Sequence, residues 1–146
     1  MAAQEIIVRR LGDETELEQA LGLRMRVFCE EQGVSREEEL DGRDGEALHV
    51  VALDSARVVG TLRVLADGGR AKIGRVAVDA AYRRRGIAER MMALGVDLAR
   101  ELGCEEAMLT AQTYAIGLYE KSGFTVDSAV FEEAGMPHVR MVRALG

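Results

Sequence analysis

Residues 83–88 combine three cationic side chains with two small residues at the predicted start of a long helix. The segment reads Arg83-Arg84-Arg85-Gly86-Ile87-Ala88. The first turn of a helix leaves backbone N–H groups without partners, and the helix dipole makes that end positive. Gly86 lets an anion approach the backbone without a Cβ in the way, and Ala88 is small for the same reason. The chemistry that this segment predicts is the binding of a pyrophosphate.

Two well-known nucleotide-binding loops do not match this segment. The chain contains neither G-x-x-x-x-G-K-[ST] nor G-x-G-x-x-G, which excludes a Walker A loop and a dinucleotide-binding fingerprint. Taken alone, the segment fits an ordinary helix start with solvated arginines as well as it fits an anion site. Other segments of the chain are needed to distinguish these two interpretations.

Three further side chains could transfer protons. His49 and His138 are the only histidines of the chain, and each could act as a base near neutral pH. Tyr119 lies in a short predicted helix and could act as an acid. From the residues alone, a structural role is the commoner interpretation for each of the three, with Tyr119 as a core aromatic whose hydroxyl finds a partner nearby.

An acidic stretch precedes His49. Four of its acids could line a substrate pocket or relay a proton through water: Glu31, Glu39, Asp41 and Asp44. A run of charges is nevertheless more often a solvated surface. Residues 37–46 carry six acids, which are Glu37, Glu38, Glu39, Asp41, Asp44 and Glu46. If they rim the substrate site, their negative field should favour a cationic or amine-bearing substrate over an anionic one. The two distant histidines and the scattered acids lack the spacing of metal ligands, so no metal is expected.

The composition is that of a single globular domain. The chain has 146 residues, of which 48% are hydrophobic and 30% charged, so residues 1–146 are expected to form one domain. A net charge of −6 and the lack of aromatic residues among the arginines argue against a nucleic-acid-binding module. Without a signal-peptide pattern or an apolar run of roughly 20 residues, we expect a cytoplasmic protein with no membrane contact. Cys29 and Cys104 are expected to be reduced thiols.

Hydrophobic patterns predict the elements that position these residues. Strands are expected at 6–8, 49–53, 58–65, 72–78, 107–111, 124–126 and 139–142. Helices are expected from Asp13 to about Phe28, from 87 to 102 and from 115 to 121, with a polar loop from Glu30 to Gly45. The order β-α-β-β-β-α-β-α-β-β indicates an α+β or mixed α/β sandwich.

Two segments together resemble the GNAT superfamily of N-acetyltransferases. The coenzyme A-binding loop of that family has the form [Gln/Arg]-x-x-Gly-x-[Gly/Ala], which residues 83–88 match. Residues 115–124, Ala-Ile-Gly-Leu-Tyr-Glu-Lys-Ser-Gly-Phe, resemble the family's A-x-x-L-Y-E-K-x-G-F segment. The resemblance spans about Val58 to Phe124. It implies a GNAT-type fold, with a central, mostly antiparallel sheet of six or seven strands flanked by helices.

The flanking segments resemble the narrower ElaA-like (YjcF-like) subgroup. Residues 26–32 resemble its R-x-V-F-x-x-E-Q block, with the V-F-x-x-E-Q part matched in spacing. Residues 39–49 resemble its E-x-D-x-x-D block and histidine, and residues 131–141 its C-terminal G-[Ile/Met]-P-H block. One position departs from the wider family. Histone-type members carry a basic glutamate on the strand where this chain has Lys72, so that catalytic glutamate is not carried over.

The resemblance implies an enzyme in which an amine attacks the thioester of acetyl-CoA directly, with acetyl-CoA as co-substrate. It implies that the cofactor-binding residues are Val76, Ala77, Val78, Arg83, Arg84, Arg85, Gly86, Ile87 and Ala88. The Val78 N–H is our candidate for polarising the thioester oxygen, and Tyr119 for protonating the leaving thiolate. By the same resemblance, the candidate bases are His138 and His49, and the candidate acceptor-binding residues are Glu31, Asp41 and Asp44.

The sequence leaves the acceptor and the assembly open. The acceptor is expected to be a small-molecule or peptide amine, and a homodimer is one option for the assembly. A non-catalytic acyl-CoA sensor on the same fold is the alternative function, because a fold does not fix a function. Replacing Gly86 by a bulky residue such as Glu is expected to abolish cofactor binding while leaving the unliganded protein's melting temperature nearly unchanged.

Overall fold

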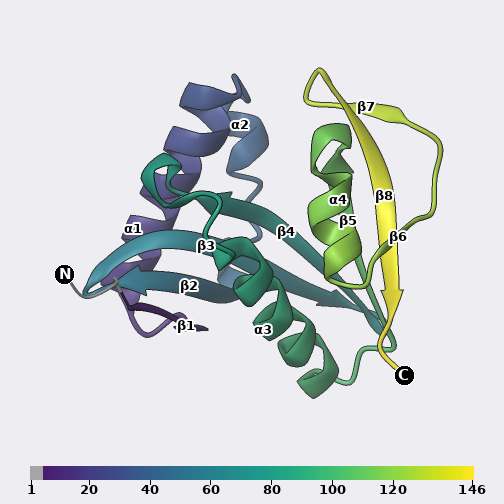
Figure 1. Ribbon diagram of the computed structural model, residues 1–146, viewed down its shortest axis with the longest axis horizontal. Coiled ribbons are helices and arrows are strands. Elements are labelled where there is room, and N and C mark those ends of the chain that lie inside the picture. The colour runs from purple at the N-terminus through teal and green to yellow at the C-terminus, as the bar shows by residue number, and fades with distance from the viewer. Residues whose placement is uncertain (1–4) are drawn as a thin grey trace.

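A mixed sheet of eight strands runs through the molecule (Figure 1). The computed structural model describes residues 5–146. The strand order is β1-β2-β3-β4-β5-β8-β6, with β7 also paired to β8, and among these pairs β4–β5 alone is parallel. The strands are β1 (Ile6–Arg10), β2 (Leu48–Asp54), β3 (Arg57–Asp67), β4 (Arg70–Val78), β5 (Glu106–Gln112), β6 (Thr125–Val126), β7 (Phe131–Glu133) and β8 (Met136–Ala144).

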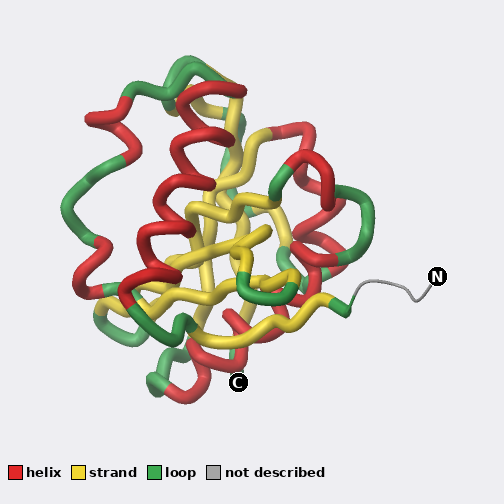
Figure 2. Tube along the Cα trace, turned by 90° about the vertical axis from the view of Figure 1, so that its left-hand side faces the viewer, coloured by secondary structure: helices red, strands yellow, loops and turns green. Residues whose placement is uncertain are grey.

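Helices cover both faces of this sheet (Figure 2). Neighbouring strand residues point to opposite faces, and in β2 Val51 packs in the cluster under α1 whereas Val50 packs in the cluster under α3. The helices are α1 (Glu14–Arg24), α2 (Arg36–Glu39), α3 (Ile87–Glu101) and α4 (Ile116–Lys121). Short 3₁₀ turns occupy 44–46, 80–82 and 113–115. No helix among residues 5–146 has the length and apolar character needed to cross a membrane.

α1 begins at the predicted position and runs into a wider helix. Asp13 has an extended backbone and accepts a hydrogen bond from the Glu16 N–H at 2.9 Å, which satisfies one free donor of the first turn. After α1 the chain continues as a π-helix, Met25–Glu31, three residues beyond the expected end at Phe28. Such segments are rare and often lie at functional sites. This one delivers Gln32 to the two cavities described below.

α3 packs its predicted apolar face on the sheet. Ile87, Met91 and Leu98 are almost completely buried, as their helical spacing predicts. Gly95 lies on the same face, and a Cβ there would already be 3.4 Å from a methyl group of Leu62. The helix therefore packs closely on the strands, which sets the position of its N-terminus.

β4 and β5 pair for only three residues. Arg70, Ala71 and Lys72 lie opposite residues 106–108, and beyond Lys72 the two strands diverge (Figure 1). The end of β4, up to Val78, therefore has β3 on one side and no strand on the other. This wedge between the two halves of the sheet is the feature that creates the site.

A β-bulge turns β4 inside the wedge. β3 advances two residues from Thr61 to Arg63, while β4 advances three, from Ala77 to Gly74. Arg75 lies in the bulge and has a left-handed backbone with a φ of 54°. Its side chain reaches the loop after α2, where it pairs with carboxylates described below.

The expected fold class is confirmed, with two local differences. The sheet is mostly antiparallel and flanked by helices, but it has eight strands where six or seven were expected. The additional strand, β7, is three exposed residues long, too short for a hydrophobic alternation to reveal it. A tight turn at Ala134 and Gly135, both with positive φ, joins it to β8.

Gly86 at the start of α3 allows a direct test of backbone strain. Its φ is 74°, in the left-handed region, and a Cβ there would meet no atom within 4 Å. The Gly86→Ala variant is therefore expected to lose about 1–2 kcal/mol of unfolding free energy in urea titrations through strain alone. This corrects the expectation that substituting Gly86 leaves the unliganded protein unchanged.

The matched control is Gly74→Ala. A Cβ at Gly74 also meets no atom within 4 Å, but its φ is not in the left-handed region. Its stability should stay the same or rise by about 0.5–1 kcal/mol, because alanine costs less backbone entropy than glycine. Equal losses in both variants would contradict the assignment of strain to Gly86.

Candidate functional site

A cavity of about 490 Å³ opens at the N-terminus of α3. We call it the α3 cavity. The first-turn N–H groups of α3 lack intrahelical acceptors, so this wall offers hydrogen-bond donors and the positive end of the helix dipole. Leu118 and Tyr119 of α4 lie on the opposite wall. Eight of the nine predicted cofactor-binding residues line the cavity: Val76, Ala77, Val78, Arg83, Arg84, Gly86, Ile87 and Ala88.

The three consecutive arginines have different contacts. Arg83 folds back, with its Nε donating to the Val78 carbonyl at 3.0 Å and its terminal nitrogen 2.8 Å from a Glu31 carboxylate oxygen. Arg85, the ninth predicted residue, does not line the cavity; its guanidinium lies 5.2 Å from the Tyr82 ring centre. Arg84 lines the cavity, is exposed and has a left-handed backbone with a φ of 64°. Arg84 is therefore the arginine best placed to meet an anion.

The backbone of Val78 faces the wedge. Asp79 N–H donates to the Val59 carbonyl at 2.8 Å, which makes Gly60 and Val78 a non-hydrogen-bonded pair of the β3–β4 ladder. The N–H and C=O of Val78 therefore point away from β3, toward the edge of β4 that is no longer paired with β5. Arg83 occupies the carbonyl. The N–H remains directed toward the α3 cavity, where it can donate to an oxyanion.

A second cavity, of about 440 Å³, adjoins the first. We call it the β8 cavity. Its walls carry Lys72 and Arg75 of β4, Thr110 of β5, Glu133 of β7 and His138 of β8. The residues common to both cavities are Gln32, Val76, Tyr114, Ala115 and Tyr119. The two cavities therefore meet inside the wedge, beside the end of β4.

Tyr119 lies at this junction. It is 9% exposed, and burial, together with the neighbouring Tyr114, raises its pKa to about 12. A phenol with this pKa stays protonated throughout the pH range in which proteins are normally studied, so Tyr119 is a neutral donor there. Within residues 5–146 its hydroxyl has no hydrogen-bond partner. It is therefore free to donate to a group that enters from either cavity.

His138 presents one nitrogen to the β8 cavity. Its Nδ1 lies 2.8 Å from the Met136 carbonyl oxygen, and since a carbonyl only accepts, Nδ1 carries the proton. In the neutral ring, Nε2 then carries a lone pair and is a hydrogen-bond acceptor. It lies 3.6 Å from a Glu133 carboxylate oxygen. Thr110 donates its hydroxyl to the same Glu133 oxygen at 3.1 Å. The Phe131 ring stacks on the imidazole at 6.2 Å between ring centres, with an angle of 25° between the ring planes.

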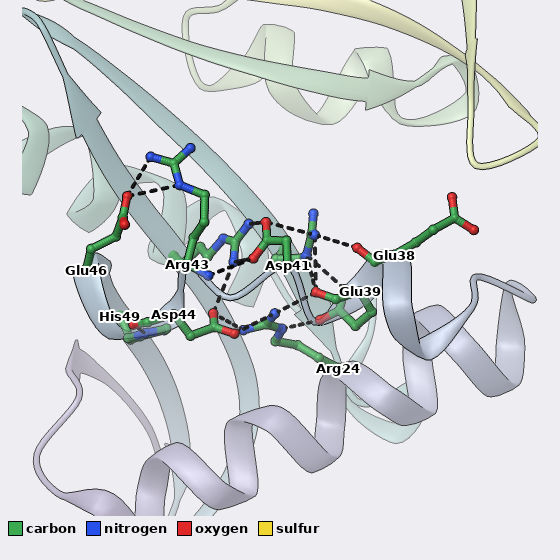
Figure 3. A network of polar contacts seen from close by, with 10 residues as sticks. Arg24, Glu38, Glu39, Asp41, Arg43, Asp44, Glu46 and His49 are labelled. Atoms are coloured by element: carbon green, nitrogen blue, oxygen red, sulfur yellow. Dashed lines mark hydrogen bonds and ion pairs between the residues drawn. The ribbon is translucent and has the colours of Figure 1, made fainter.

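The acidic loop is bound by arginines (Figure 3). Arg24 of α1 contacts Glu39 and Asp44, Arg63 of β3 contacts Asp41 and Asp44, and Arg75 of β4 contacts Glu39 and Asp41. Arg24 and Glu39 are each 2% exposed. We call these six residues the arginine–acid network. It holds the loop after α2 against the sheet and forms one wall of the β8 cavity.

This network weakens the expectation of a negative field that selects cationic acceptors, because it neutralises Glu39, Asp41 and Asp44 among the six acids of residues 37–46. Three carboxylates face three guanidinium groups, so their charges cancel locally. A hydrogen bond from Arg63 holds the pKa of Asp41 far below its usual range. Burial alone would raise the pKa of Asp44, but hydrogen bonds from Arg24 and Arg63 outweigh it and lower that pKa. Both acids therefore stay ionised, and their stabilising contribution is lost only as the pH falls from about 4 through the lowered values.

The sequence and fold of this chain agree with one family of known proteins. The family described as "Acetyltransferase (GNAT) domain" matches residues 13–145. The chain belongs to the GNAT acetyltransferase family. It is 34% identical to the uncharacterized N-acetyltransferase YjcF of Bacillus subtilis, over 90% of this chain and 94% of YjcF. The expected resemblance to the ElaA-like (YjcF-like) subgroup is thereby confirmed.

Solved structures give the same result. Escherichia coli ElaA superposes with a TM-score of 0.85 at 27% identity, covering 95% of this chain and 99% of ElaA. An acyl-CoA N-acyltransferase from Pseudomonas aeruginosa superposes with a TM-score of 0.82 at 29% identity, covering 96% of this chain and 99% of that one. The GNAT fold of this chain is therefore shown by both sequence and structure.

Three predicted site residues lie elsewhere in this GNAT domain than expected. His49 lines neither cavity, and its Nε2 lies 2.9 Å from the Asp44 carbonyl oxygen, so it is a buried structural contact of the loop. Asp44 also lines neither cavity, and its carboxylate is bound by Arg24 and Arg63. Glu31 lines the α3 cavity and pairs with Arg83, on the side opposite to the expected acceptor pocket.

Other residues of the site were not predicted from the sequence. Glu133 and Thr110 join His138 only because β5, β7 and β8 are neighbours in the sheet. Gln112 donates to Gln32 at 2.7 Å and bridges the end of β5 to the end of the π-helix, beside the junction of the cavities. No spacing in the chain connects these pairs. Within residues 5–146, no group of three or more His, Cys, Asp or Glu residues could hold a metal ion.

The arginine–acid network should be essential to folding. Arg24→Met removes a guanidinium that is 2% exposed and leaves carboxylates buried beside the gap, which is expected to cost about 3–5 kcal/mol of unfolding free energy. The control is Arg43→Met, which removes an arginine of the loop after α2 that pairs with Glu46 at the surface. That change should cost no more than about 1 kcal/mol. Similar losses for both variants in urea unfolding would contradict the role given to the buried network.

Proposed function

We propose that this GNAT protein transfers an acetyl group from acetyl-CoA to a primary amine of a small molecule or peptide. The observation that carries the proposal is the meeting of two cavities beside the end of β4, with Tyr119 in both. One cavity ends on a helix N-terminus, as an anionic cofactor requires, and the other is polar and holds a candidate base. A transfer reaction needs such a pair of sites with one point of contact.

The α3 cavity fits the co-substrate on three observations. The N-terminus of α3 and Arg84 offer donors and positive charge to a pyrophosphate. The left-handed backbone of Gly86 leaves open space where a Cβ would stand. The edge of β4 at Val76 to Val78 offers backbone groups to the pantetheine amides, because β5 has left that side. The Pseudomonas aeruginosa relative is an acyl-CoA N-acyltransferase, which supports the same assignment.

The reaction follows from these positions. The acceptor amine, after losing a proton to His138 Nε2, attacks the thioester carbonyl and forms the C–N bond. The Val78 N–H donates to the oxygen as it becomes negative, since it points toward the wedge. The C–S bond then breaks, Tyr119 protonates the departing sulfur, and the nitrogen's second proton restores the phenol. The products are the acetylated amine and free coenzyme A.

Cofactor binding is tested by a carboxylate placed at the start of α3. Ala88 lines the α3 cavity, so Ala88→Glu should repel the pyrophosphate and abolish the rise in melting temperature on adding acetyl-CoA. In the parent, ligand at 100 times its dissociation constant should stabilise by about 2.7 kcal/mol. A glutamate in the first turn is favoured by the helix dipole, so the unliganded variant should fold normally.

The matched control is Ala93→Glu. Ala93 is an exposed residue on the same helix and lies outside both cavities. It should keep the full thermal shift. A thermal shift that persists in Ala88→Glu, or disappears in both variants, would remove the basis for placing the cofactor in the α3 cavity.

The role of Tyr119 is tested by Tyr119→Phe. This change keeps the buried ring and removes only the hydroxyl, so the melting temperature should stay close to the parent's. If proton donation to sulfur limits turnover, the rate of thiol release should fall roughly 10²–10⁴-fold. Acetyl-CoA affinity should change little, because the loss of one neutral hydrogen bond costs about 0.5–1.5 kcal/mol.

Tyr114→Phe is the control for that experiment. Tyr114 also lines both cavities, but it is 77% exposed. Its variant should turn over at nearly the parental rate. A folded Tyr119→Phe protein with parental turnover would assign the proton donor to water or another group. Binding of acetyl-CoA without turnover of any amine would leave the protein as an acyl-CoA sensor.

A further inference from the structure

We propose that the acceptor carries an anionic group close to its amine, so that the substrate class is amino acids and related amino-carboxylates. Lys72 binds the anion, and Glu133 together with His138 binds the amine. The inference rests on the proposed acyl transfer and names the acceptor of the same site. It follows from which charges of the β8 cavity remain without a partner.

Most charges that line the β8 cavity are already paired within the protein. Arg63 is 4% exposed and is held by Asp41 and Asp44. Arg75 is held by Glu39 and Asp41. Arg43 is held by Glu46 at 2.6 Å. These pairs contribute little net field inside the cavity, so they do not select the charge of a ligand.

Lys72 is the exception among the basic residues that line the cavity. Within residues 5–146 its ammonium group makes no hydrogen bond or ion pair, although the side chain lines the cavity wall. Lys72 and Lys121 are the only lysines in a chain that otherwise uses arginine, and Lys121 lies outside both cavities. A flexible ammonium with no internal partner is suited to bind a carboxylate that enters with the substrate. Lys72 therefore supplies a positive pole.

Glu133 and His138 supply the opposite pole. A Glu133 oxygen and His138 Nε2 are 3.6 Å apart, and both accept hydrogen bonds when the imidazole is neutral. An ammonium group has three donors and can reach two acceptors at this separation. The Thr110 hydroxyl holds the Glu133 oxygen in place. The carboxylate attracts the ammonium, and Nε2 accepts one of its protons before the amine attacks.

The two poles lie on the same face of the sheet at a short separation. Lys72 is opposite Met108 in β5, and Thr110 follows two residues later with its side chain on the same face. Two residues of a strand span about 7 Å. Lys72 and the Glu133 contact of Thr110 are therefore about one side-chain repeat apart, and the lysine stem can shorten the gap. A ligand with an amine and a carboxylate a few bonds apart matches this arrangement.

The test compares amino acids with their own carboxamides, which keep the amine and lose the negative charge. Thiol release from acetyl-CoA is measured for both ligand forms. The parent protein should prefer the free amino acid. Lys72→Met should lower kcat/KM for the amino acid about 10–100-fold, mainly through KM, and leave the carboxamide unchanged. Lys121→Met is the control and should change neither ligand.

A second variant separates the two poles. Glu133→Gln should raise KM for the amino acid and the carboxamide alike, because both ligands present the same ammonium group. Its control is Glu132→Gln, on the same short strand but with its side chain on the opposite face. That variant should behave as the parent for both ligands.

The outcomes distinguish this inference from the proposed function. A parent protein that prefers carboxamides, or equal losses for both ligand forms in Lys72→Met, would overturn the amino-carboxylate acceptor while acyl transfer stands. Thermal stabilisation by acetyl-CoA without thiol release for any amine would overturn acyl transfer and this inference together. A loss limited to the amino acid in Lys72→Met, with both controls unchanged, would establish it.

Discussion

The separation of β4 from β5 after three paired residues is the constraint on which the rest of the structure depends. A parallel pair that continued to Val78 would fill the wedge with ladder hydrogen bonds and leave no room for a ligand. Because the strands diverge, the edge of β4 keeps backbone groups for a bound molecule instead. α3 covers one end of this edge and the loop after α2 covers the other, which gives two cavities with a common centre. The position of Tyr119 at that centre follows from α4, which stays with β5 on the far side of the wedge.

The arginine–acid network replaces an apolar core on one side of the wedge. Buried ion pairs are a costly way to stabilise a fold, because desolvation consumes most of the Coulomb energy. Their value here is geometric. Arg24, Arg63 and Arg75 come from α1, β3 and the β4 bulge, so their fork-shaped donors tie three elements to a single loop. The network also cancels its own charge, which leaves Lys72, Glu133 and Glu38 as the charges that set the field inside the β8 cavity.

The sequence predicted one half of the site well, because that half is local. Residues 76–88 form a strand end, a loop and a helix start, and the chemistry of a helix N-terminus can be inferred from consecutive residues. Eight of the nine cofactor-binding residues predicted there line the α3 cavity. Arg85 was misplaced because a run of arginines does not reveal that one of them stacks on Tyr82. Most of the strands and three of the helices were also predicted from periodicity, which depends only on near neighbours.

The acceptor half could not be predicted in the same way, since its residues come from elements far apart in the chain. Asp41 and Asp44 were identified as candidates, but the arginines that neutralise them lie 19 to 34 residues away, and no pattern links them. His49 and His138 could not be distinguished by type, yet only His138 lines a cavity. The pairing of β7 with β8 that delivers Glu133 depends on a three-residue strand.

The central claim is that the wedge beside the end of β4 receives the thioester arm of the co-substrate. Backbone amide NMR spectra, recorded while coenzyme A is added, test this most directly. We expect the largest shift changes at the amides of residues 76–78 and 86–88, with Val78 among them and the amides of residues 39–44 nearly unchanged. Changes centred on the β8 cavity, or unchanged amides at 76–78 under saturating coenzyme A, would contradict it.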